Sequence, residues 1–256
     1  MTILEDQDIQ GNPSAPPSYS NLPDVPEDIR HVKPTNYLYI VRSFGLIDDT
    51  YVIDPTYEPT IPSYMLPKVK EGQKRKNLCL CSTFGSVKAD VWIRAGSARG
   101  MSAEKHEKRR TSIKASSDCR PVTVKHAESG NPFHLVCDSA ASVVVYLPRT
   151  FSGLLVTGTD LGSVRYSPEV SARLTVLSEI NGIRYRFLGD YESSNWDKDA
   201  EHWEGDEVRL HTGMGTIRVA FLDEEWPTIR RSSWFFRCIL LTATSLLAIW
   251  VVAIVS

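Results

Sequence analysis

The stretch Ser82-Thr83-Phe84-Gly85-Ser86-Val87-Lys88-Ala89-Asp90-Val91-Trp92-Ile93 decides the fold. From Val87 onward every second residue is apolar, and this period of two predicts a β-strand with one buried face. Val87, Ala89, Val91 and Ile93 share that face, and Lys88, Asp90 and Trp92 take the other. Before the strand, Gly85 suits a tight turn that needs either a positive φ or a close backbone approach. The stretch therefore predicts a tight turn that leads into a half-buried strand.

The same phrase recurs along the chain. Copies stand at residues 43–47, 82–87, 138–143, 159–164 and 212–217, and a weaker copy ends at Val122. Val122, Val143 and Val164 follow one another at intervals of 21 residues, which suits the stacking of short strands as successive rungs. Loops over residues 54–67, 94–110 and 191–205 account for the longer intervals between the other copies.

These repeats predict an all-β body over residues 34–225, built either as a repetitive β-solenoid or as a two-sheet β-sandwich. The flanks have a different character. Residues 1–33 are acidic and Pro-rich with almost no apolar periodicity, so we expect a disordered arm. Residues 226–237 form a basic and aromatic juxtamembrane segment, and residues 238–255 are expected to be a transmembrane helix.

Six phrases in a fixed order resemble a known family. They are N-Y-L-Y-I at 36–40, Y-V-I-D-P at 51–55, K-N-L at 76–78, L-P-R-T-F-S-G at 147–153, L-G-D at 188–190 and W-E-G-D-E at 203–207. Over about residues 35–225 the chain is similar to the fungal domain-of-unknown-function family 7330. The resemblance implies a repetitive β-rich domain with no assigned activity, and it supplies no catalytic residues. Ala141 departs from the pattern, because the repeat has glycine there.

The C-terminal segment is the strongest functional signal. Residues 238–255 carry no charge, and at about 1.5 Å per residue they span roughly 27 Å, the thickness of a thin bilayer. The residues just before this segment have the aromatic and basic composition of the cytoplasmic membrane interface, and they include Arg230, Arg231, Trp234 and Arg237. We therefore predict a single-pass, tail-anchored protein with the lipid bilayer as a partner, its body in the cytosol and the endoplasmic reticulum as a candidate membrane. A buried C-terminal helix or a glycolipid-anchor signal is the less favoured interpretation.

The N-terminal arm carries one short motif. Pro16, Pro17 and Tyr19 form the P-P-x-Y pattern, whose polyproline II conformation fits the groove of a WW domain. Such domains occur in ubiquitin ligases, so a WW-domain protein of that kind is a candidate partner. The pattern also arises by chance in Pro-rich arms, and a neutral linker is the competing interpretation.

Charge and clusters argue against several other classes. Lys and Arg total 29 against 31 Asp and Glu, so the chain is near neutral, and its basic runs lack interleaved aromatics. Nucleic acid is therefore not expected as a partner. Those basic runs are expected in solvated turns, with anionic lipid headgroups as the alternative contact. They comprise Lys68, Lys70, Lys74, Arg75 and Lys76, and then Lys105, Lys108, Arg109, Arg110 and Lys114.

The candidates for chemistry are few. Cys79 and Cys81 would share one face of a strand, but no second ligand pair follows, so buried thiols are favoured over half of a metal site. The acidic residues lack the calcium-loop pattern and are expected in a solvated loop. They are Asp197, Asp199, Glu201, Glu204, Asp206 and Glu207, with His202 among them. His106, His126, His134 and His211 are scattered. We expect no metal, no cofactor and no enzymatic activity.

The sequence thus favours a cytosol-facing scaffold or adaptor. One alternative is a carbohydrate- or ligand-binding or hydrolytic β domain that uses a groove on the sheet. In that case Trp92, Trp196 and Trp203 would be exposed contact residues. The other alternative is an inert domain for structural display.

Overall fold

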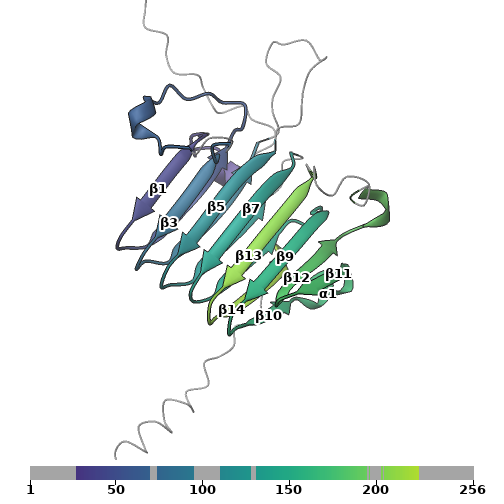
Figure 1. Cartoon of the computed structure of the whole chain (residues 1–256). Coiled ribbons are helices and arrows are strands. Elements are labelled where there is room, and N and C mark those ends of the chain that lie inside the picture. Colours follow the sequence, from purple (N-terminus) through teal and green to yellow (C-terminus); the bar gives the residue numbers. More distant parts are fainter. Residues whose placement is uncertain are drawn as a thin grey trace, which may run out of the picture. The chain divides into compact units, whose positions relative to one another are not determined.

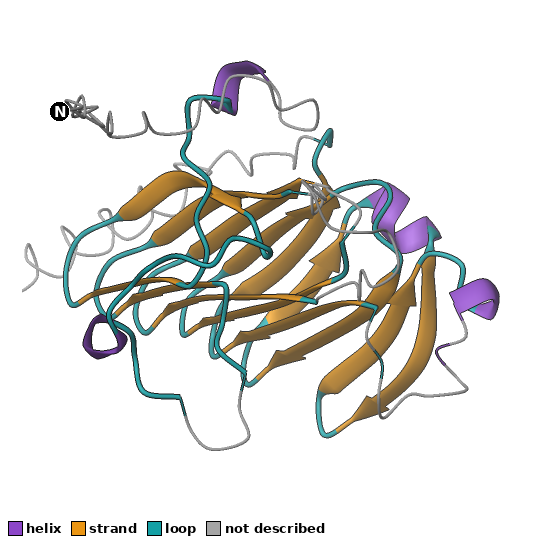
Figure 2. Cartoon of the chain, turned by 90° about the horizontal axis from the view of Figure 1, so that it is seen from above, coloured by secondary structure: helices purple, strands orange, loops and turns teal. Residues whose placement is uncertain are grey.

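The computed structural model describes residues 27–69, 74–94, 110–127, 131–194, 196, 203 and 205–224. Its first compact unit ends at Leu222 and consists of two β-sheets that face each other, as Figure 2 shows. The eight-stranded sheet has the spatial order β1 (Leu38–Arg42), β3 (Leu78–Ser82), β5 (Thr111–Ser117), β7 (Phe133–Ser139), β13 (Asp206–Thr212), β9 (Gly153–Thr159), β12 (Ile183–Leu188) and β11 (Leu174–Ile180). The six-stranded sheet has the order β10 (Ser163–Tyr166), β14 (Thr216–Phe221), β8 (Val143–Leu147), β6 (Val122–Ala127), β4 (Val87–Ile93) and β2 (Ile47–Ile53).

Each rung of the structure is one strand from each sheet, joined by a tight turn. The rungs are β1–β2, β3–β4, β5–β6, β7–β8, β9–β10 and β13–β14, and neighbouring rungs pair in parallel in both sheets. All the tight turns therefore lie at one edge, the turn edge, and the longer connections lie at the opposite loop edge (Figure 1). The predicted all-β body is confirmed, and of the two architectures left open it has the rung stacking of a solenoid.

The repeat phrases locate one continuous row of the six-stranded sheet. The residue that ends each phrase pairs with its counterpart in the next rung, in the order Ile47, Val87, Val122, Val143, Ile217 and Val164. Val164 is partly buried and the other five are buried. Since every member points inward, the row contributes a stripe of branched side chains to the hydrophobic core.

The order of the last rungs differs from the expectation. Regular spacing of Val122, Val143 and Val164 predicts that these three residues stack consecutively, but only the first two do so. The final rung, β13–β14, is inserted between β7–β8 and β9–β10, so that Ile217 lies between Val143 and Val164. Figure 1 shows β13 between β7 and β9. The chain therefore leaves one rung position, a strand position in each sheet, open after β7–β8 and fills it with β13 and β14.

The core lies between the sheets and follows from the alternation within the strands. In β4, β5, β7 and β8 every second residue is buried, as a period of two requires. The largest fully buried side chains include Leu80, Ile113, Leu135 and Leu155 of the eight-stranded sheet. At the loop edge, the ring of Phe133 lies between those of His126 and Phe151, at centroid distances of 3.9 and 5.7 Å.

Two asparagines from the sequence phrases at 36–40 and 76–78 form hydrogen bonds at the loop edge. Asn36 donates from Nδ2 to the carbonyl of Tyr57 at 2.8 Å, and its Oδ1 accepts from Nδ2 of Asn77 at 2.8 Å. Asn77 in turn accepts through Oδ1 from the amide of Ser112 at 2.7 Å. Both asparagine residues are buried, so these bonds satisfy polar groups at the start of three successive rungs.

Short helices and one hairpin complete the unit. The hairpin β11–β12 continues the eight-stranded sheet beyond β9, and Asn181 and Gly182 at its turn both have positive φ, as a tight hairpin favours. Helix α1 (Pro168–Ala172) is capped by Ser167, which accepts from the amide of Val170. Two 3₁₀ turns, η2 (Ser63–Met65) and η3 (Glu192–Ser194), lie in loops.

One short element lies within the residues assigned to the predicted arm. The 3₁₀ turn η1 (Glu27–Ile29) lies within residues 1–33, which were expected to be disordered. Ile29 is buried and forms a small cluster with Val52, Val32 and Trp92. Ile29 therefore covers part of the outer face of the six-stranded sheet. Residues 1–26 lie outside the described residues.

Candidate functional site

The turn edge is held together by a ladder of hydroxyl groups. In successive rungs the last residue of the first strand is Ser82, Ser117, Ser139 and Thr212, and these residues pair in register. Ser117 accepts from the amide of Arg120 in its own turn at 3.0 Å and donates to the carbonyl of Gly85 in the preceding turn at 2.8 Å. The serine of the repeat phrase thus satisfies buried polar groups and connects neighbouring turns.

The ladder continues through the inserted rung. Ser139 donates to the carbonyl of Arg120 at 2.7 Å, and Thr212 donates to the carbonyl of Ala141. Ala141 is the position at which the repeat's glycine is missing. Its amide binds the hydroxyl of Ser139 two residues before it, whereas Gly85 binds Ser82 three residues before it. Three residues separate Ser139 from Val143 of the core row, whereas four separate Ser82 from Val87, and the ladder is kept at this shorter turn without glycine.

Close packing of the turns explains most of their glycines. A Cβ added to Gly85 would lie 1.7 Å from the carbonyl oxygen of Gly45, and one added to Gly215 would lie 1.5 Å from that of Ala141. Gly45 instead has a φ of +92°, and nothing lies within 4 Å of its added Cβ. Both physical reasons expected for the turn glycines therefore occur. Gly85 and Gly215 allow a close backbone approach, and Gly45 has a positive φ.

Large apolar side chains project from the tips of these closely packed turns. Their exposed fractions are 74% for Phe44, 52% for Phe84, 74% for Met214 and 81% for Leu161, and we call these four residues the apolar turn row. The rings of Phe44 and Phe84 stack with centroids 5.0 Å apart. Between the two pairs, the intervening rungs place the exposed residues Cys119 and Ala140 in the turns. An exposed apolar surface of this kind is typical of a protein interface.

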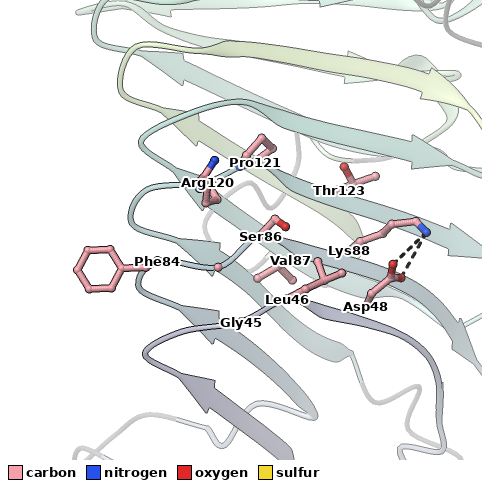
Figure 3. A pocket seen from close by; sticks show the side chains of 11 residues that line it. Gly45, Leu46, Asp48, Phe84, Ser86, Val87, Lys88, Arg120, Pro121 and Thr123 are labelled. Carbon is pink, nitrogen blue, oxygen red and sulfur yellow. Dashed lines mark hydrogen bonds and ion pairs between the residues drawn. The ribbon is translucent and has the colours of Figure 1, made fainter.

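A shallow depression of about 570 Å³ lies next to Phe84 on the outer face of the six-stranded sheet. Phe84 is one of its lining residues, and Figure 3 shows the Phe84 ring at the turn, while Lys88 and Asp48 meet over the strands. Their Nζ and Oδ1 atoms are 3.3 Å apart. Leu46, Arg120 and Thr123 are among the other lining residues, so the surface combines an apolar wall with both signs of charge.

A charged cluster on the outer face of the eight-stranded sheet holds the inserted strand. Glu207 of β13 accepts from Arg110 at 2.5 Å and from Arg209. Burial acts to raise the pKa of Glu207, but the hydrogen bonds from both arginines outweigh it, so the pKa is lowered. Burial also lowers the pKa of the neighbouring His134. Near the turn edge, His211 of β13 lies 3.5 Å from Asp138 and 3.3 Å from Asp160.

Two cysteines form a close pair on the same outer face. Cys79 and Cys81 of β3 share that face, as the sequence predicted, and their Sγ atoms are 3.6 Å apart. The hydroxyl of Ser116 lies 3.1 Å from Sγ of Cys81. The hydrogen bond from the Cys79 thiol, supported by Ser116 and by the charge of Lys114, lowers the pKa of Cys81 to about 6 against the effect of burial. The same contact raises the pKa of Cys79, which is buried.

Several sequence-based expectations change once the structure is seen. Asp206 and Glu207 were expected in a solvated loop, but they begin strand β13, and Asp206 accepts from the amide of Phe133 at 3.0 Å. Arg110 and Lys114 were expected in a turn, but Arg110 pairs with Glu207, and Lys114 belongs to β5. The physical reason is strand register, because the parallel pairing of the strands places Arg110 and Arg209 around the Glu207 carboxylate.

The histidines and tryptophans have structural contacts. Burial lowers the pKa of His126 to about 3, so its core ring is neutral at physiological pH. Trp92 packs with the cluster around Ile29, Trp196 contacts the ring of Tyr191, and Trp203 contacts that of Phe187. All three tryptophans are half-buried. They therefore do not form the set of exposed contact residues that was expected for a β domain with a ligand-binding groove on the sheet. Within the described ranges, no group of three or more His, Cys, Asp and Glu side chains is placed to hold a metal ion.

Some predicted site residues are not among those described. Pro16, Pro17 and Tyr19 of the arm lie outside the described residues, as do Arg230, Arg231, Trp234, Arg237 and the segment 238–255. In the part of the chain that is described, no helix is long and apolar enough to span a bilayer. The predictions made for the arm and for the C-terminal segment therefore remain predictions.

Sequence reasoning missed the apolar turn row, although a signal for it exists. In four copies of the repeat phrase a large apolar residue stands directly before glycine, at Phe44, Phe84, Leu161 and Met214. Taken singly, each is an ordinary turn residue. Only the parallel stacking of the rungs brings all four to one edge.

The comparisons with other proteins agree with the observed limits of this unit. Neither the curated proteins nor the solved structures include a match to the chain. Residues 36–224 match the family model of a domain of unknown function, DUF7330. The matched range covers all six rungs and ends just after β14. The chain therefore belongs to the DUF7330 family.

Proposed function

We propose that the chain is a membrane-held adaptor whose solenoid binds a partner protein through the apolar turn row. The observation that carries this proposal is the row itself, because four large apolar side chains at the tips of the turns are more than half exposed. Surfaces of this kind mark contacts with other macromolecules more often than they mark free surface. The proposed activity is binding, and it requires no catalytic group.

Rigid support for the row favours a binding role. The hydroxyl ladder fixes neighbouring turns relative to one another, and the backbones of the turns touch at Gly85 and Gly215. Phe44 and Phe84 are further ordered by their mutual stacking. A side chain that is already ordered loses less conformational entropy on binding, so a larger share of the contact energy appears as affinity.

The connections of the solenoid leave the turn edge open to a partner. The chain enters β1 at Leu38 and leaves β14 at Phe221, and both of these points lie at the loop edge. With strands of about 3.3 Å per residue, the two edges are separated by roughly 20 Å. The first strand of the body therefore begins, and its last strand ends, on the side away from the apolar turn row.

The two flanks supply the adaptor part of the proposal. In this scheme the charge-free segment 238–255 holds the chain at a membrane, with Arg230, Arg231, Trp234 and Arg237 at the interface. Pro16, Pro17 and Tyr19 of the arm recruit a WW-domain protein, for example a ubiquitin ligase. Joining two binding elements on one tethered chain raises the local concentration of each partner near the other.

Site-specific photo-crosslinking in the full-length chain tests the binding surface. A photoreactive phenylalanine analogue at Phe84 or Leu161 is expected to give a discrete crosslinked species. The same analogue at Val176, which is 68% exposed on β11 and outside the row, serves as the matched control. Equal crosslinking at all three positions, or none at the row, contradicts the proposal. Substitution Phe44→Asp should remove the crosslink formed from position 84, because it breaks the stacked pair.

The flanking elements are tested separately. Alkaline carbonate extraction is expected to leave the full-length chain in the membrane pellet and to release a chain that ends at Arg231. A WW-domain pull-down is expected to recover the full-length chain and to lose it on Tyr19→Ala. Release of the full-length chain would remove the membrane part of the proposal, and full retention of Tyr19→Ala would remove the WW part. Neither result affects the crosslinking test.

A further inference from the structure

We propose that Cys79 and Cys81 are a redox-active dithiol in which Cys81 attacks a hydroperoxide and Cys79 closes a disulfide. The proposal is independent of the adaptor function, because the pair lies on the outer face of the eight-stranded sheet rather than at the turn edge. It rests on the position of the two sulfur atoms, on the groups that surround them and on the difference in their exposure.

The backbone of β3 holds the two sulfur atoms within reach of a bond. Residues two apart on a strand point to the same face, and their Cα atoms are separated by about 6.6 Å. Disulfides occur with Cα separations of about 4.4 to 6.8 Å, so this spacing lies near the upper end of the range. The Sγ atoms are already 3.6 Å apart, which leaves a small movement of two side chains to reach bonding distance. A bond formed at the end of the range is readily reduced again, as a reversible switch requires.

Groups from the next strand favour the thiolate form of Cys81. Its sulfur lies 3.1 Å from the hydroxyl of Ser116, which can donate to it, and Lys114 of the same strand pairs in register with Cys79. The lowered pKa of Cys81 agrees with this arrangement, although the charge of Asp118 acts in the opposite direction. Since the thiolate is the nucleophilic form of cysteine, Cys81 is the reactive member of the pair.

Exposure assigns the second role to Cys79. Cys81 is half-buried and reachable from solvent, whereas Cys79 is only 3% exposed and has a raised pKa. A hydroperoxide can therefore reach Cys81 but not Cys79. The Cys79 thiol needs only to reach its neighbour, and its contact with the sulfur of Cys81 already provides that access. Cys137, buried in the core with a raised pKa, is shielded from the same chemistry.

The reaction balances with a hydroperoxide as the only co-reactant. The Cys81 thiolate attacks one peroxide oxygen, the O–O bond breaks, and Cys81 becomes a sulfenic acid while the other oxygen leaves as hydroxide or alkoxide and takes up a proton. Sulfur of Cys79 then attacks the sulfenic sulfur, its proton goes to the departing hydroxyl group, and water leaves as the S–S bond forms. With hydrogen peroxide, two thiols and one peroxide yield one disulfide and two waters.

Competitive alkylation of the unmodified full-length chain, read by mass spectrometry, tests the assignment. At pH 7 with equimolar hydrogen peroxide, Cys81 is expected to be lost at least tenfold faster than Cys119, the exposed thiol of the β5–β6 turn. An intramolecular Cys79–Cys81 disulfide should form and be reversed by dithiothreitol. Loss of Cys81 and Cys119 at equal rates overturns the proposal, as does a disulfide that involves Cys119. This comparison is internal to one molecule and does not depend on how any variant folds.

Three variants then separate the roles. Cys79→Ser is expected to stop at the sulfenic acid of Cys81, which a dimedone-type probe captures, and Cys81→Ser is expected to abolish both products. Ser116→Ala should slow the loss of Cys81 without changing that of Cys119, since only the hydroxyl at 3.1 Å is removed. Capture of a sulfenic acid on Cys79 in the Cys81→Ser chain at the wild-type rate would reverse the assignment and refute it.

Discussion

The first four rungs and the last two are built from the same repeat but assembled in different ways. From β1–β2 to β7–β8 each rung stacks on the one made just before it, and β6 and β8 pair across an interval of 21 residues at Val122 and Val143. Between β8 and β14 the chain continues through another rung, α1 and a hairpin, so that Ser142 and Thr216 meet across 74 residues. The comparison teaches that one repeated phrase specifies which residues stack but leaves the order of the rungs to the connections.

The insertion also changes what each rung contributes to stability. An end rung of a solenoid contacts one neighbour, and its loss leaves the rest of the stack in place. The last rung synthesised here has two neighbours, and His211 links it to both of them through Asp138 and Asp160. Glu207 also pairs with Arg110, which lies just before β5, one rung beyond β7–β8. Stability should therefore depend more strongly on the C-terminal end of the domain than on its N-terminal end.

Truncation gives the largest expected effect. A chain that ends at Gly205 lacks β13 and β14, which leaves a gap between β7–β8 and β9–β10, and we expect it to lose cooperative unfolding altogether. A chain that begins at Arg75 lacks the end rung β1–β2 with the turns η1 and η2, and it is expected to unfold cooperatively at a reduced Tm. Circular dichroism during thermal unfolding distinguishes the two. If both truncated chains behave alike, the inserted rung has no special role.

Glycine substitution at the turn edge comes next. Gly215→Ala places a Cβ 1.5 Å from the Ala141 carbonyl oxygen, within a rung that is confined on both sides, and we expect a loss of roughly 3 kcal/mol. For a domain of this size that corresponds to about 10 °C in Tm. Gly85→Ala should cost about half as much, because its neighbour Gly45 belongs to the end rung and has room to shift.

Gly158→Ala is the control for these two substitutions. Its added Cβ would meet His211 at 3.4 Å and Ile183 at 3.6 Å, which are near-ordinary contacts, so a change within about 0.5 kcal/mol is expected. Urea unfolding of the four chains measures the order. A loss for Gly85→Ala equal to that for Gly215→Ala would show that the end rung is as firmly held as the inserted one.

The ion pair of the inserted strand should give a smaller loss. Glu207→Gln removes the carboxylate between Arg110 and Arg209, and we expect about 2 kcal/mol at pH 7, because the Glu207 side chain is only 8% exposed. Glu169→Gln removes a surface partner of Arg149 and is expected to cost below about 1 kcal/mol. The folded pKa of Glu207 is depressed, so its contribution is present above the unfolded pKa and is lost as pH falls through the folded value. Urea unfolding at pH 7 and pH 4 tests both statements, and equal losses for the two variants would contradict the first.

A histidine of the sequential stack has the smallest expected effect at pH 7 and affects stability only in acid. Because the folded pKa of His126 is about 3, the unfolded chain takes up the proton first as pH falls below about 6.5. This side chain should therefore subtract about 1.4 kcal/mol of stability per pH unit between about pH 6 and pH 3. The variant His126→Leu is expected to flatten the dependence of stability on pH over this window. An unchanged slope would show that His126 is already protonated in the folded chain.

The sequence predicted the stacked row but not the order of its members. Ile47, Val87, Val122, Val143, Val164 and Ile217 are recognisable because turn phrase and alternation are local properties. Branched side chains stack comparably well on any similar neighbour, so nothing local distinguishes Val143 followed by Val164 from Val143 followed by Ile217. The difference arises from the long connection through α1 and the β11–β12 hairpin, which no repeat describes.

The candidate sites were predictable to different degrees for a related reason. Strand alternation predicts that Cys79 and Cys81 share a face, because the two residues lie two positions apart on one strand. Ser116 and Lys114, which set the character of the thiols, come from β5 and reach them only through the register of the parallel sheet. The same holds for the pairing of Arg110 with Glu207, which lie 97 residues apart. Local pattern therefore identifies the reactive atoms, and tertiary pairing supplies their environment.

The inserted rung also has a consequence for biosynthesis. A growing chain emerges N-terminus first, and domains fold as their segments become available. Strands β7 and β9 face each other across an unfilled position until β13 and β14 have been made, so each presents an open edge to other chains for that period. This edge stays open from the synthesis of β9, at Gly153–Thr159, until β14 ends at Phe221. We expect the nascent protein to depend on chaperones most strongly during the synthesis of residues 153–221.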